Sequence, residues 1–482
     1  MLTENPLLRV DLYKMGHLEQ YCPGTAKVYS YLIARSGKTF DRTVFFGLQY
    51  VLERYLSQPL TPEMGEEFLS VRSRILGMEN TPDVERKSRA LCKYGRWPLL
   101  IKAVPEGTVM PVRNVLMTIT NTLPEFYWCV GFVESLLLKV WYPTTVASCC
   151  FQYRLAVERA WARTVDGVAG LEFAVHDFGY RGDSSEEGAA ISGVAHLTSF
   201  YGSDTVPALR CAEQYYGTAP GEFVMASVPA TEHSVMCSYG RDDELGAFRR
   251  MLDLYPTGIV SIVSDTFDVY RVLTEFAQEL RPRIMCRDGK VVFRPDSGDP
   301  VKIICGDPDA EEDSPQWLGA IRLLDRMFGS TRNAKGYLVL DPHVGLIYGD
   351  GMFMARYEQA LETLKSMGYA ASNLIIGVGG ILRNHSRDTL GFAIKATYVE
   401  VDGQPREIEK DPVTDPGKKS HKGLLTLNKT GGAWETIDQV DEAAESAGAL
   451  QPVYDDGTLL NRCTLAEIRS RVTEAVIMEA AR

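Results

Sequence analysis

The sequence lacks a CxxC cysteine pair, a long uninterrupted apolar run and an excess of positive charge. Its ten cysteines are scattered along the chain, a spacing that indicates neither a zinc cluster nor a disulfide framework. Adjacent Cys149 and Cys150 fall within a helical pattern and are expected to pack as small apolar groups. We therefore expect no protein-held metal cluster and a reduced, cytoplasmic compartment.

The missing apolar and basic segments exclude further classes of protein. The longest apolar stretch, 130–151, is interrupted by Glu134, Lys139 and Pro143, so it is typical of buried helix and strand and not of a membrane span. The first residues carry no basic segment followed by an apolar one, so no signal peptide is expected. The net charge of −12 argues against nucleic-acid and membrane partners but leaves room for a local basic pocket.

With 482 residues, the chain is long enough for a large core and two structural units. The middle third alternates predicted strands with predicted helices. We expect strands at 171–175, 223–228, 259–263, 291–293, 344–347 and 374–376, and helices at 186–201, 244–254, 268–280, 317–328 and 353–367. Such repeated units predict a parallel sheet with outer helices, either a barrel or an open doubly wound sheet.

Polar residues distinguish these two architectures, because they follow nearly every predicted strand. They occur at His176–Arg181, His233, Ser264–Asp268, Arg294–Gly298, Gly349–Gly351 and Gly377–Gly380. An open sheet concentrates its ligand groups at one switch point, whereas a barrel collects them from most strand ends. The distribution therefore favours a barrel.

The two ends of the chain have a different pattern. Alternating segments occur at 27–32 and 109–116, and a hairpin-like run at 396–404 contains Asp402-Gly403, a good turn signal. We expect residues 1–165 and 390–482 to form one mainly antiparallel α+β domain. The α/β barrel is then formed by residues 166–389.

His233 is the most informative single residue, because it stands between a predicted strand and a predicted helix in Ser227-Val-Pro-Ala-Thr-Glu-His-Ser. An imidazole beside Glu232 can serve as a base, an orienting group or a nucleophile. The alternative is an ordinary surface histidine that follows a strand. The polar residues at the neighbouring strand ends favour a functional role.

The glycine turns predict a phosphate site. Gly349-Asp350-Gly351 and Gly379-Gly380 follow two successive strands, and the last loops of a barrel commonly bind phosphate through backbone N–H groups. The same glycines can also be turn residues alone. If the site exists, Asp296 and Asp350 are natural acceptors for ribose hydroxyls.

Cations and aromatic rings complete the predicted site. Arg181 and Arg294 offer forked donors for phosphate oxygens. Further cations, any of which can also be a solvated surface group, are Arg35, Arg387, Lys395 and Lys410. Phe178, Tyr180 and Tyr13 supply flat faces on which a heterocycle can stack. Together these groups predict a site for a phosphorylated ribose, a second anion and a planar base.

Several longer motifs resemble those of the nicotinamide phosphoribosyltransferases, and the resemblance runs from Asp11 to the C-terminal helix. They are Asp11-Leu-Tyr-Lys, Lys27-Val-Tyr-Ser-Tyr, Phe46-Gly-Leu-Gln-Tyr, Lys102-Ala-Val-Pro-Glu-Gly, His176-Asp-Phe-Gly-Tyr-Arg-Gly, Ser227-Val-Pro-Ala-Thr-Glu-His-Ser, Arg294-Pro-Asp-Ser-Gly and Lys410-Asp-Pro-Val. The resemblance implies an irregular barrel of the type II phosphoribosyltransferase kind, a homodimer, and transfer of phosphoribose from phosphoribosyl pyrophosphate to nicotinamide. It also implies Mg²⁺ bridged by the substrate and ATP as a facultative activator that phosphorylates His233.

The same resemblance assigns site residues by position. Phe178 and the partner's Tyr13 hold nicotinamide, and Asp204 receives its carboxamide N–H. The ribose phosphate groups are Arg294, Asp296, Gly349, Asp350, Gly379 and Gly380, and further pocket positions are Ser227, Ser264 and Asp268. Arg181 and His233 meet pyrophosphate together with Arg35, Arg387, Lys395 and Lys410 of the neighbouring chain.

Two departures and two alternatives accompany this assignment. The glycine turn after Ile376 is one residue shorter than in the family, and Asp183 stands where an uncharged residue is usual, which adds negative charge near an anion site. The alternatives are a nicotinate phosphoribosyltransferase and a non-catalytic binding protein on the same scaffold. Asp204 disfavours the first, because a carboxylate repels nicotinate, and the retained cations with His233 disfavour the second.

Overall fold

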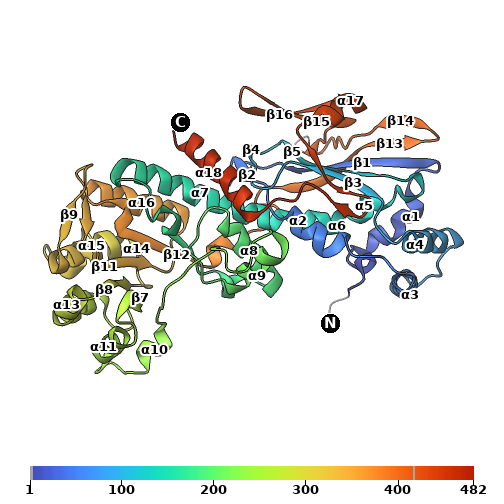
Figure 1. The fold of residues 1–482 in the computed structure, drawn as a ribbon. Helices are drawn as coiled ribbons and strands as arrows, with labels where there is room; N and C mark the ends of the chain where they lie inside the picture. Colours follow the sequence, from blue (N-terminus) through green and yellow to red (C-terminus); the bar gives the residue numbers. More distant parts are fainter. Residues whose placement is uncertain (1–3, 416–417, 482) are drawn as a thin grey trace. The chain divides into compact units, whose positions relative to one another are not determined.

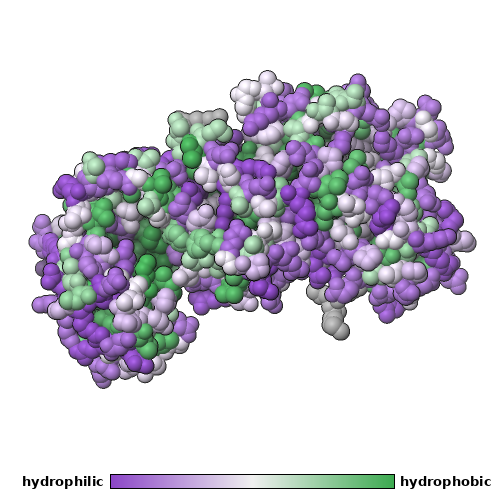
Figure 2. Space-filling model, viewed as in Figure 1, coloured by the Kyte–Doolittle hydropathy of each residue, from purple (hydrophilic) through white to green (hydrophobic). Residues whose placement is uncertain are grey.

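The computed structural model describes residues 4–415 and 418–481, which form two compact units, each built from several stretches of the chain (Figure 1). Unit 1 contains the described residues up to Ser148, Ala212–Thr218, and the described residues from His385 to Val472. Unit 2 contains Cys149–Cys211, Ala219–Asn384 and the described residues from Thr473. Hydrophilic side chains cover much of the face seen in Figure 2, with apolar groups scattered among them.

Unit 2 is built around a five-stranded parallel sheet in the order β6-β12-β11-β8-β7. The strands are β6 (Val175–Asp177), β12 (Leu374–Val378), β11 (Val344–Tyr348), β8 (Asp288–Arg294) and β7 (Thr257–Val263). Residues such as Ile262 and Phe293 are fully buried, as expected for parallel strands covered on both faces. Helices α11 (Glu244–Leu254), α13 (Ala277–Met285), α15 (Pro315–Phe328) and α16 (Met354–Ser366) lie outside the strands (Figure 1).

Isolated parallel bridges continue this sheet from β7 back to β6. Ser261 of β7 pairs with Ala230, Ala226 pairs with Gly202, and Ser203 pairs with Asp177 of β6. The connections therefore close a ring, although two of its members are too short to be strands. This irregular closure confirms the predicted barrel.

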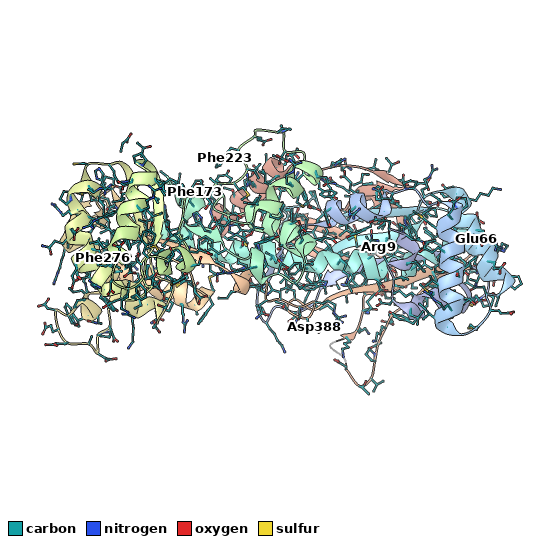
Figure 3. The ribbon with its side chains drawn as sticks, turned by 90° about the horizontal axis from the view of Figure 1, so that it is seen from below. Arg9, Glu66, Phe173, Phe223, Phe276 and Asp388 are labelled. Carbon is teal, nitrogen blue, oxygen red and sulfur yellow. The ribbon has the colours of Figure 1, made fainter. Side chains whose placement is uncertain are left out.

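Two of the predicted strands are wrong. Residues 171–173 form a 3₁₀ turn and the strand begins only at Val175. The segment 223–228 contributes a bridge at Ala226 and no strand. Its exposed Phe223 instead packs in an aromatic group, with ring centroids 6.5 Å from Phe173 and 5.5 Å from Tyr201 (Figure 3).

Local capping explains where the helices of unit 2 begin. Ser314 accepts a hydrogen bond from the Trp317 N–H and is followed by Pro315, a combination that starts α15. Asp299 accepts from two amides in the same way before α14 (Pro300–Cys305). The remaining helices of this unit are α8 (Glu186–Leu197), α10 (His233–Cys237) and α12 (Val269–Arg271). Three further helices have residues in both units: α7 (Trp141–Thr164), α9 (Val206–Tyr215) and α18 (Leu465–Ala480).

Unit 1 contains a seven-stranded antiparallel sheet in the order β14-β13-β1-β5-β3-β17-β18. Its strands are β14 (Gln404–Glu407), β13 (Phe392–Val401), β1 (Thr25–Ala34), β5 (Val115–Asn121), β3 (Leu99–Ala103), β17 (Gln451–Asp455) and β18 (Thr458–Leu459). The predicted hairpin is confirmed as β13 and β14. Asp402 (φ 53°) and Gly403 (φ 71°) form its turn, in which two successive left-handed residues match the twist of the strands.

Shorter elements surround this sheet. The helices of unit 1 are α1 (His17–Gln20), α2 (Leu48–Val51), α3 (Pro62–Leu76), α4 (Pro82–Tyr94), α5 (Cys129–Phe132), α6 (Glu134–Leu137) and α17 (Glu442–Ala447). The short strand pairs are β2 (Arg42–Val44) with β4 (Val109–Pro111) and β15 (Leu424–Thr430) with β16 (Ala433–Val440); unit 2 adds β9 (Ser330–Arg332) with β10 (Leu338–Leu340). The mainly antiparallel α+β domain predicted from both chain ends is confirmed.

Candidate active site

The carboxyl ends of the parallel strands of unit 2 bring together many of the predicted residues. Phe178 follows β6, Arg294 ends β8, Gly349 follows β11 and Gly379 follows β12. Adjacent parallel strands end at the same edge of a sheet, so these positions are neighbours. We call the groups at this edge the barrel-edge site.

Phe178 and Arg294 contact one another at the barrel-edge site. The guanidinium carbon of Arg294 lies 5.3 Å from the centroid of the Phe178 ring. A Cβ added to Gly377 would lie 2.1 Å from the same ring, so glycine on β12 is what lets the ring pack there. The half-buried Phe178 is thus a fixed flat surface with a cation beside it.

Arg294 also binds Asp296 across a tight turn. Nη2 of Arg294 lies 2.8 Å from Oδ2 of Asp296, and both side chains are mostly buried. Gly349 packs against this pair so closely that a Cβ would lie 2.0 Å from Oδ1 of Asp296. A carboxylate and a guanidinium therefore face the turn that carries Asp350, which is itself exposed.

His233 is the first residue of α10 and lies beside Asp265, a residue that the sequence analysis did not select. Its Nε2 lies 3.2 Å from Oδ1 of Asp265. The His233 side chain is 47% exposed, whereas that of Asp265 is 3% exposed. The other oxygen of Asp265 accepts from the Asp296 N–H (2.9 Å) and the Ser297 hydroxyl (2.6 Å). Asp265 therefore connects the histidine to the loop after β8.

A signal for Asp265 was present in the sequence, in the polar run Ser264–Asp268 directly after β7. The two residues that were selected there serve the backbone. The Ser264 hydroxyl is buried, donates to the Ile262 carbonyl (2.8 Å) and accepts from the Arg294 N–H (3.1 Å). Asp268 accepts from two amides at the start of α12. Of the three, Asp265 is the one that contacts the histidine.

Asp204 lies beside the end of β6, where its N–H donates to the Asp177 carbonyl (2.9 Å). The Ser227 hydroxyl donates a hydrogen bond to its carboxylate. Burial lowers the pKa of nearby His176, an effect that Asp204 opposes, so this imidazole tends to be neutral. The site thus has an exposed carboxylate beside the end of β6, the strand that Phe178 follows, and a hydroxyl orients it.

Arg181 and the glycine turn lie close together at the same edge. Arg181 is exposed in the loop after β6. A Cβ on its neighbour Gly182 would lie 2.9 Å from the Cα of Gly380, so the backbones of the two loops are in contact. Backbone groups and one guanidinium are therefore available there for an anion.

The other predicted cations gather in unit 1. Burial lowers the pKa of half-buried Lys395, and the charges of Arg35, Lys410 and Arg387 lower it further, while Glu134 raises it. The four cations are thus within electrostatic reach of one another, and we call them the cation patch. Arg35 donates to the Gly391 carbonyl (3.0 Å).

The loop residues of the cation patch are held differently. Arg387 is exposed beside Asp388, with 2.7 Å between Nη2 and Oδ1. The Lys410 N–H donates to the Ser420 hydroxyl (2.9 Å), which fixes the backbone and leaves the side chain exposed. Two of the four ammonium or guanidinium groups can therefore reorient toward a bound anion.

Tyr13 is connected to the cation patch through Lys14 and Glu134. The Tyr13 ring is 64% exposed, and the Lys14 ammonium lies 5.3 Å from its centroid. Lys14 pairs with Glu134 at 2.7 Å, and Glu134 acts on Lys395. Glu134 was not predicted as a site residue, because no local motif distinguishes it from other acidic residues at the start of a helix. The predicted site residues thus form two groups, one in each unit.

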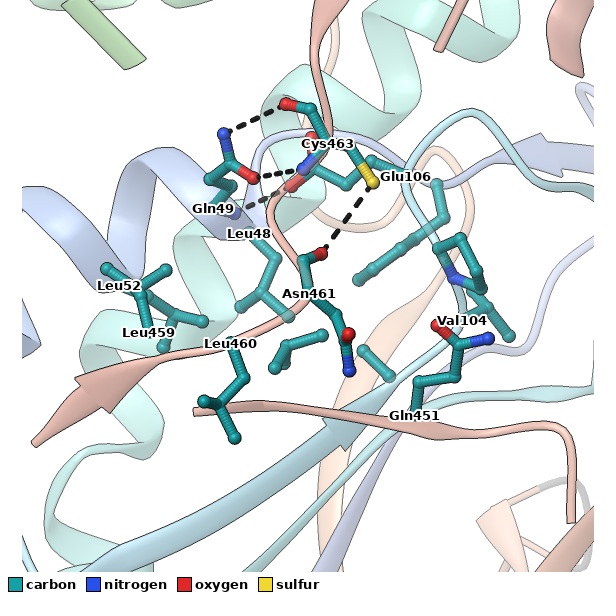
Figure 4. A pocket seen from close by; sticks show the side chains of 14 residues that line it. Leu48, Gln49, Leu52, Val104, Glu106, Gln451, Leu459, Leu460, Asn461 and Cys463 are labelled. Atoms are coloured by element: carbon teal, nitrogen blue, oxygen red, sulfur yellow. Dashed lines mark hydrogen bonds between the residues drawn. The ribbon is translucent and has the colours of Figure 1, made fainter. Parts of the chain in front are cut away.

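A small cavity of about 20 Å³ in unit 1 is lined by none of the predicted site residues (Figure 4). On its wall, Gln49 donates to the Tyr215 and Cys463 carbonyls and accepts from the Cys463 N–H. Glu106 accepts from the Gln49 N–H (2.6 Å), and burial raises the pKa of Glu106 to about 7. The motifs around Gln49 and Glu106 therefore join separate segments of unit 1.

The part of the chain that the structure describes lacks two further features. No helix there is long and apolar enough to cross a membrane. Nor does any group of three or more His, Cys, Asp or Glu side chains among those residues have an arrangement that could hold a metal ion.

Comparison with family models and curated proteins gives concordant matches. The model of the nicotinate phosphoribosyltransferase (NAPRTase) family matches residues 173–457, and that of the nicotinamide phosphoribosyltransferase N-terminal domain matches residues 5–68. The chain is 43% identical to the nicotinamide phosphoribosyltransferase of Acinetobacter baylyi, over 98% of this chain and 97% of the relative. It is 40% identical to that of Xanthomonas campestris pv. campestris, over 98% and 99%.

Solved structures share the fold at low sequence identity. A nicotinate-nucleotide pyrophosphorylase from Pyrococcus furiosus matches with a TM-score of 0.60 at 15% identity, over 99% of this chain and 97% of that one. Human nicotinic acid phosphoribosyltransferase matches with a TM-score of 0.57 at 16% identity, over 96% and 93%. The predicted type II phosphoribosyltransferase fold is confirmed.

Proposed function

The chain belongs to the nicotinate phosphoribosyltransferase (NAPRTase) family, and we propose that it transfers phosphoribose from phosphoribosyl pyrophosphate to nicotinamide. The products are nicotinamide mononucleotide and pyrophosphate, an entry step to NAD. Curated relatives that carry the nicotinamide name cover nearly the whole chain, which supports the amide over the acid as substrate.

The observation that carries this choice is the exposed carboxylate of Asp204 beside the end of β6, the strand that Phe178 follows. A carboxylate accepts hydrogen bonds from the N–H groups of a carboxamide and repels the carboxylate of nicotinate. The Ser227 hydroxyl donates a hydrogen bond to Oδ1 of Asp204, which orients the carboxylate. A planar amide stacked on Phe178 would find a matching acceptor at this position.

Binding of phosphoribosyl pyrophosphate is assigned to the remaining barrel-edge groups. Asp296 and Asp350 would accept from ribose hydroxyls, and Arg294 with the turns at Gly349, Gly379 and Gly380 would bind the 5′-phosphate. Arg181 and His233 would meet the pyrophosphate. The site is expected to work by positioning and electrostatics, because bond breaking at ribose C1 develops positive charge there and needs a stabilised leaving group.

Mg²⁺ is proposed as an ion bridged by the substrate. It prefers phosphate oxygens and retained waters to an all-protein cage, and it would neutralise charge on the departing pyrophosphate. Several aspartates lie near the buried Tyr348: burial raises its pKa, and the charges of Asp265, Asp296, Asp350 and Asp299 add to that rise. The negative charge of these aspartates would favour a hydrated cation bound to the substrate nearby.

ATP is proposed to act through His233. A carboxylate can only accept, so the contact with Asp265 assigns the proton to Nε2 and the lone pair to Nδ1. Nδ1 would attack the γ-phosphate of ATP, forming an N–P bond as the P–O bond to ADP breaks and ADP leaves with the electron pair. Phosphohistidine would then place negative charge where pyrophosphate binds and be hydrolysed by water later.

A homodimer with shared sites is proposed from the division of the site residues. The barrel-edge site lies in unit 2, whereas Tyr13 and the cation patch lie in unit 1. An isologous dimer lets unit 1 of each chain complete the site of its partner. The exposed Tyr13 ring and the exposed Arg387 and Lys410 side chains support this role.

The proposed function is tested by mixing the protein with Mg²⁺, phosphoribosyl pyrophosphate and either nicotinamide, nicotinate or neither, and measuring pyrophosphate. We expect release with nicotinamide far above that with nicotinate. Equal or preferred use of nicotinate would contradict the proposed substrate, and no release with either would contradict the proposed activity.

A further inference from the structure

Two loops of the barrel-edge site are joined beneath the surface. The first, 178–183, follows β6 and carries Phe178 and Arg181. The second, 379–383, follows β12 and carries the glycine turn. Their backbones meet at Gly182 and Gly380, where a Cβ added to Gly182 would lie 2.9 Å from the Cα of Gly380. An interaction that holds the two loops together therefore also fixes the positions of Phe178, Arg181 and the glycine turn.

Arg383 is placed to do this. Its side chain is 1% exposed and binds two carboxylates, with 2.6 Å from Nη2 to Oδ2 of Asp177 and 3.0 Å from Nε to Oδ2 of Asp183. Asp177 immediately precedes the first loop and Asp183 ends it. One guanidinium of the second loop thus holds the first loop at both of its ends.

Both carboxylates have further donors. Oδ1 of Asp177 accepts from the Gly179 N–H (2.8 Å), and Oδ2 of Asp183 accepts from the buried Ser192 hydroxyl (2.8 Å). A Cβ added to Gly179 would lie 3.0 Å from Nε of Arg383, so glycine leaves space for the guanidinium. Such hydrogen bonds are what make buried charges tolerable.

The charge balance explains the unusual Asp183. From its position in the sequence, this carboxylate was expected to add negative charge near an anion site. Its side chain is 5% exposed and directed to Arg383, so its charge is compensated inside the protein and Arg181 remains available at the surface. A buried ion pair adds little net stability compared with apolar packing. The Arg383–Asp183 pair is therefore better explained by a role in fixing the geometry of the loops than by a role in stability.

We propose that Arg383 is a positioning residue for the transferase reaction: by bridging Asp177 and Asp183, it fixes the loop that presents Phe178 and Arg181 against the glycine turn. This inference rests on the proposed function. Arg383 does not itself contact substrate. Loss of the bridge should weaken binding of phosphoribosyl pyrophosphate, because Arg181 and the glycine turn would no longer be held in register.

The primary test is Asp183→Asn, which keeps the shape of the side chain and leaves Arg383 paired with Asp177. We expect the KM for phosphoribosyl pyrophosphate to rise about tenfold with kcat within about twofold, as expected when one buried ion pair that orders a binding loop is removed. Asp183→Glu, which retains the carboxylate, should recover part of this affinity. The matched control is Glu362→Gln, which breaks the exposed Arg163–Glu362 pair of unit 2 and should leave the KM unchanged.

A second test uses Arg383→Lys, which retains the charge but has a single point donor that cannot bridge both carboxylates. The KM increases of Asp183→Asn and Arg383→Lys should not multiply in the double variant, because both remove the same bridge. Multiplicative effects would contradict the proposal.

Hydrogen exchange separates this inference from the proposed function. In the full-length Asp183→Asn protein without substrate, amides of both loops should exchange faster together, while those of Glu362→Gln exchange as in the wild type. Faster exchange confined to the loop after β6, or an unchanged KM, would overturn the positioning role. A wild-type protein that makes no nicotinamide mononucleotide contradicts the proposed function and leaves the exchange result as the test of the bridge.

Discussion

Nε2 of His233 and Oδ1 of Asp265 lie 3.2 Å apart, and the carboxylate is 3% exposed while the imidazole is 47% exposed. The buried partner therefore orients a histidine that remains accessible to ligand. This pair gives the proposed phosphorylation a defined nucleophile, because an Nε2–H that donates to Asp265 leaves the lone pair on Nδ1.

Asp265→Asn should lower the rate of phosphohistidine formation by about 100-fold, since it removes the negative charge that orients the imidazole and favours its positively charged form during attack. ATP-independent synthesis should fall much less. The measurement is the initial rate of label incorporation from γ-labelled ATP. Asp341→Asn is the matched control, because Asp341 pairs with His343 at 2.7 Å and precedes β11 instead of following a barrel strand. Equal rates for the two variants would contradict the role given to Asp265.

His233→Ala should abolish ATP hydrolysis and weaken binding of phosphoribosyl pyrophosphate, yet leave slow synthesis without ATP. After incubation with γ-labelled ATP, label on the wild-type protein should be lost in acid and survive alkali, as expected for a phosphorylated imidazole. Label that survives acid, or that persists in His233→Ala, would assign the phosphate to another residue.

Asp204→Asn should raise the use of nicotinate relative to nicotinamide, because it removes the repulsion of the acid. We expect a change in selectivity of about 1–3 kcal/mol, as for one polar contact with a bound substrate. The measurement is the ratio of kcat/KM for the two substrates. Ser227→Ala, which only frees the carboxylate, should change the ratio less. An unaltered ratio in Asp204→Asn would remove the basis for choosing the amide.

Mixing Tyr13→Ala protein with His233→Ala protein should restore activity through hybrid dimers. Each hybrid has one site that carries neither substitution, provided that unit 1 of one chain completes unit 2 of the other. Activity is measured after subunit exchange, and dimer formation is checked separately. Mixed dimers without recovered activity would contradict the shared site.

Glu106 predicts a pH dependence of stability. Burial raises the pKa of its carboxyl group to about 7 in the folded protein, above the value of 4.5 for a free glutamate. The folded state then binds more protons than the unfolded state between these values, so stability falls as pH rises through this window. At about 1.4 kcal/mol per pKa unit, the loss attributable to Glu106 is on the order of 3 kcal/mol between pH 4.5 and 7.

Glu106→Gln tests this effect, because the amide still accepts from the Gln49 N–H but carries no charge. Denaturant unfolding at pH 5 and pH 8 should show the variant gaining stability relative to wild type as pH rises. The exposed Glu435→Gln serves as the control. A difference between wild type and Glu106→Gln that does not vary with pH would show that the carboxyl group titrates normally.

Elements with strong local patterns were predictable from the amino-acid sequence. Helix α11 occupies the predicted 244–254, and strands β7 and β8 contain the predicted 259–263 and 291–293. The Asp402-Gly403 turn also follows from local chemistry, since both residues tolerate a positive φ. Polar residues after successive strands predicted the barrel, because parallel strands place their carboxyl ends at one edge.

Features that depend on residues distant in the chain became visible in the folded structure alone. The segment 223–228 has a strand-like composition but pairs at Ala226 alone, because its partners are single residues of irregular loops. Arg383 and Asp177 are 206 positions apart, and no local pattern shows that they meet. Likewise, the contact with His233, which lies 32 positions away in the chain, distinguishes Asp265 from Ser264 and Asp268. Composition and periodicity report what each residue can do, whereas long-range packing decides which side chains share a site.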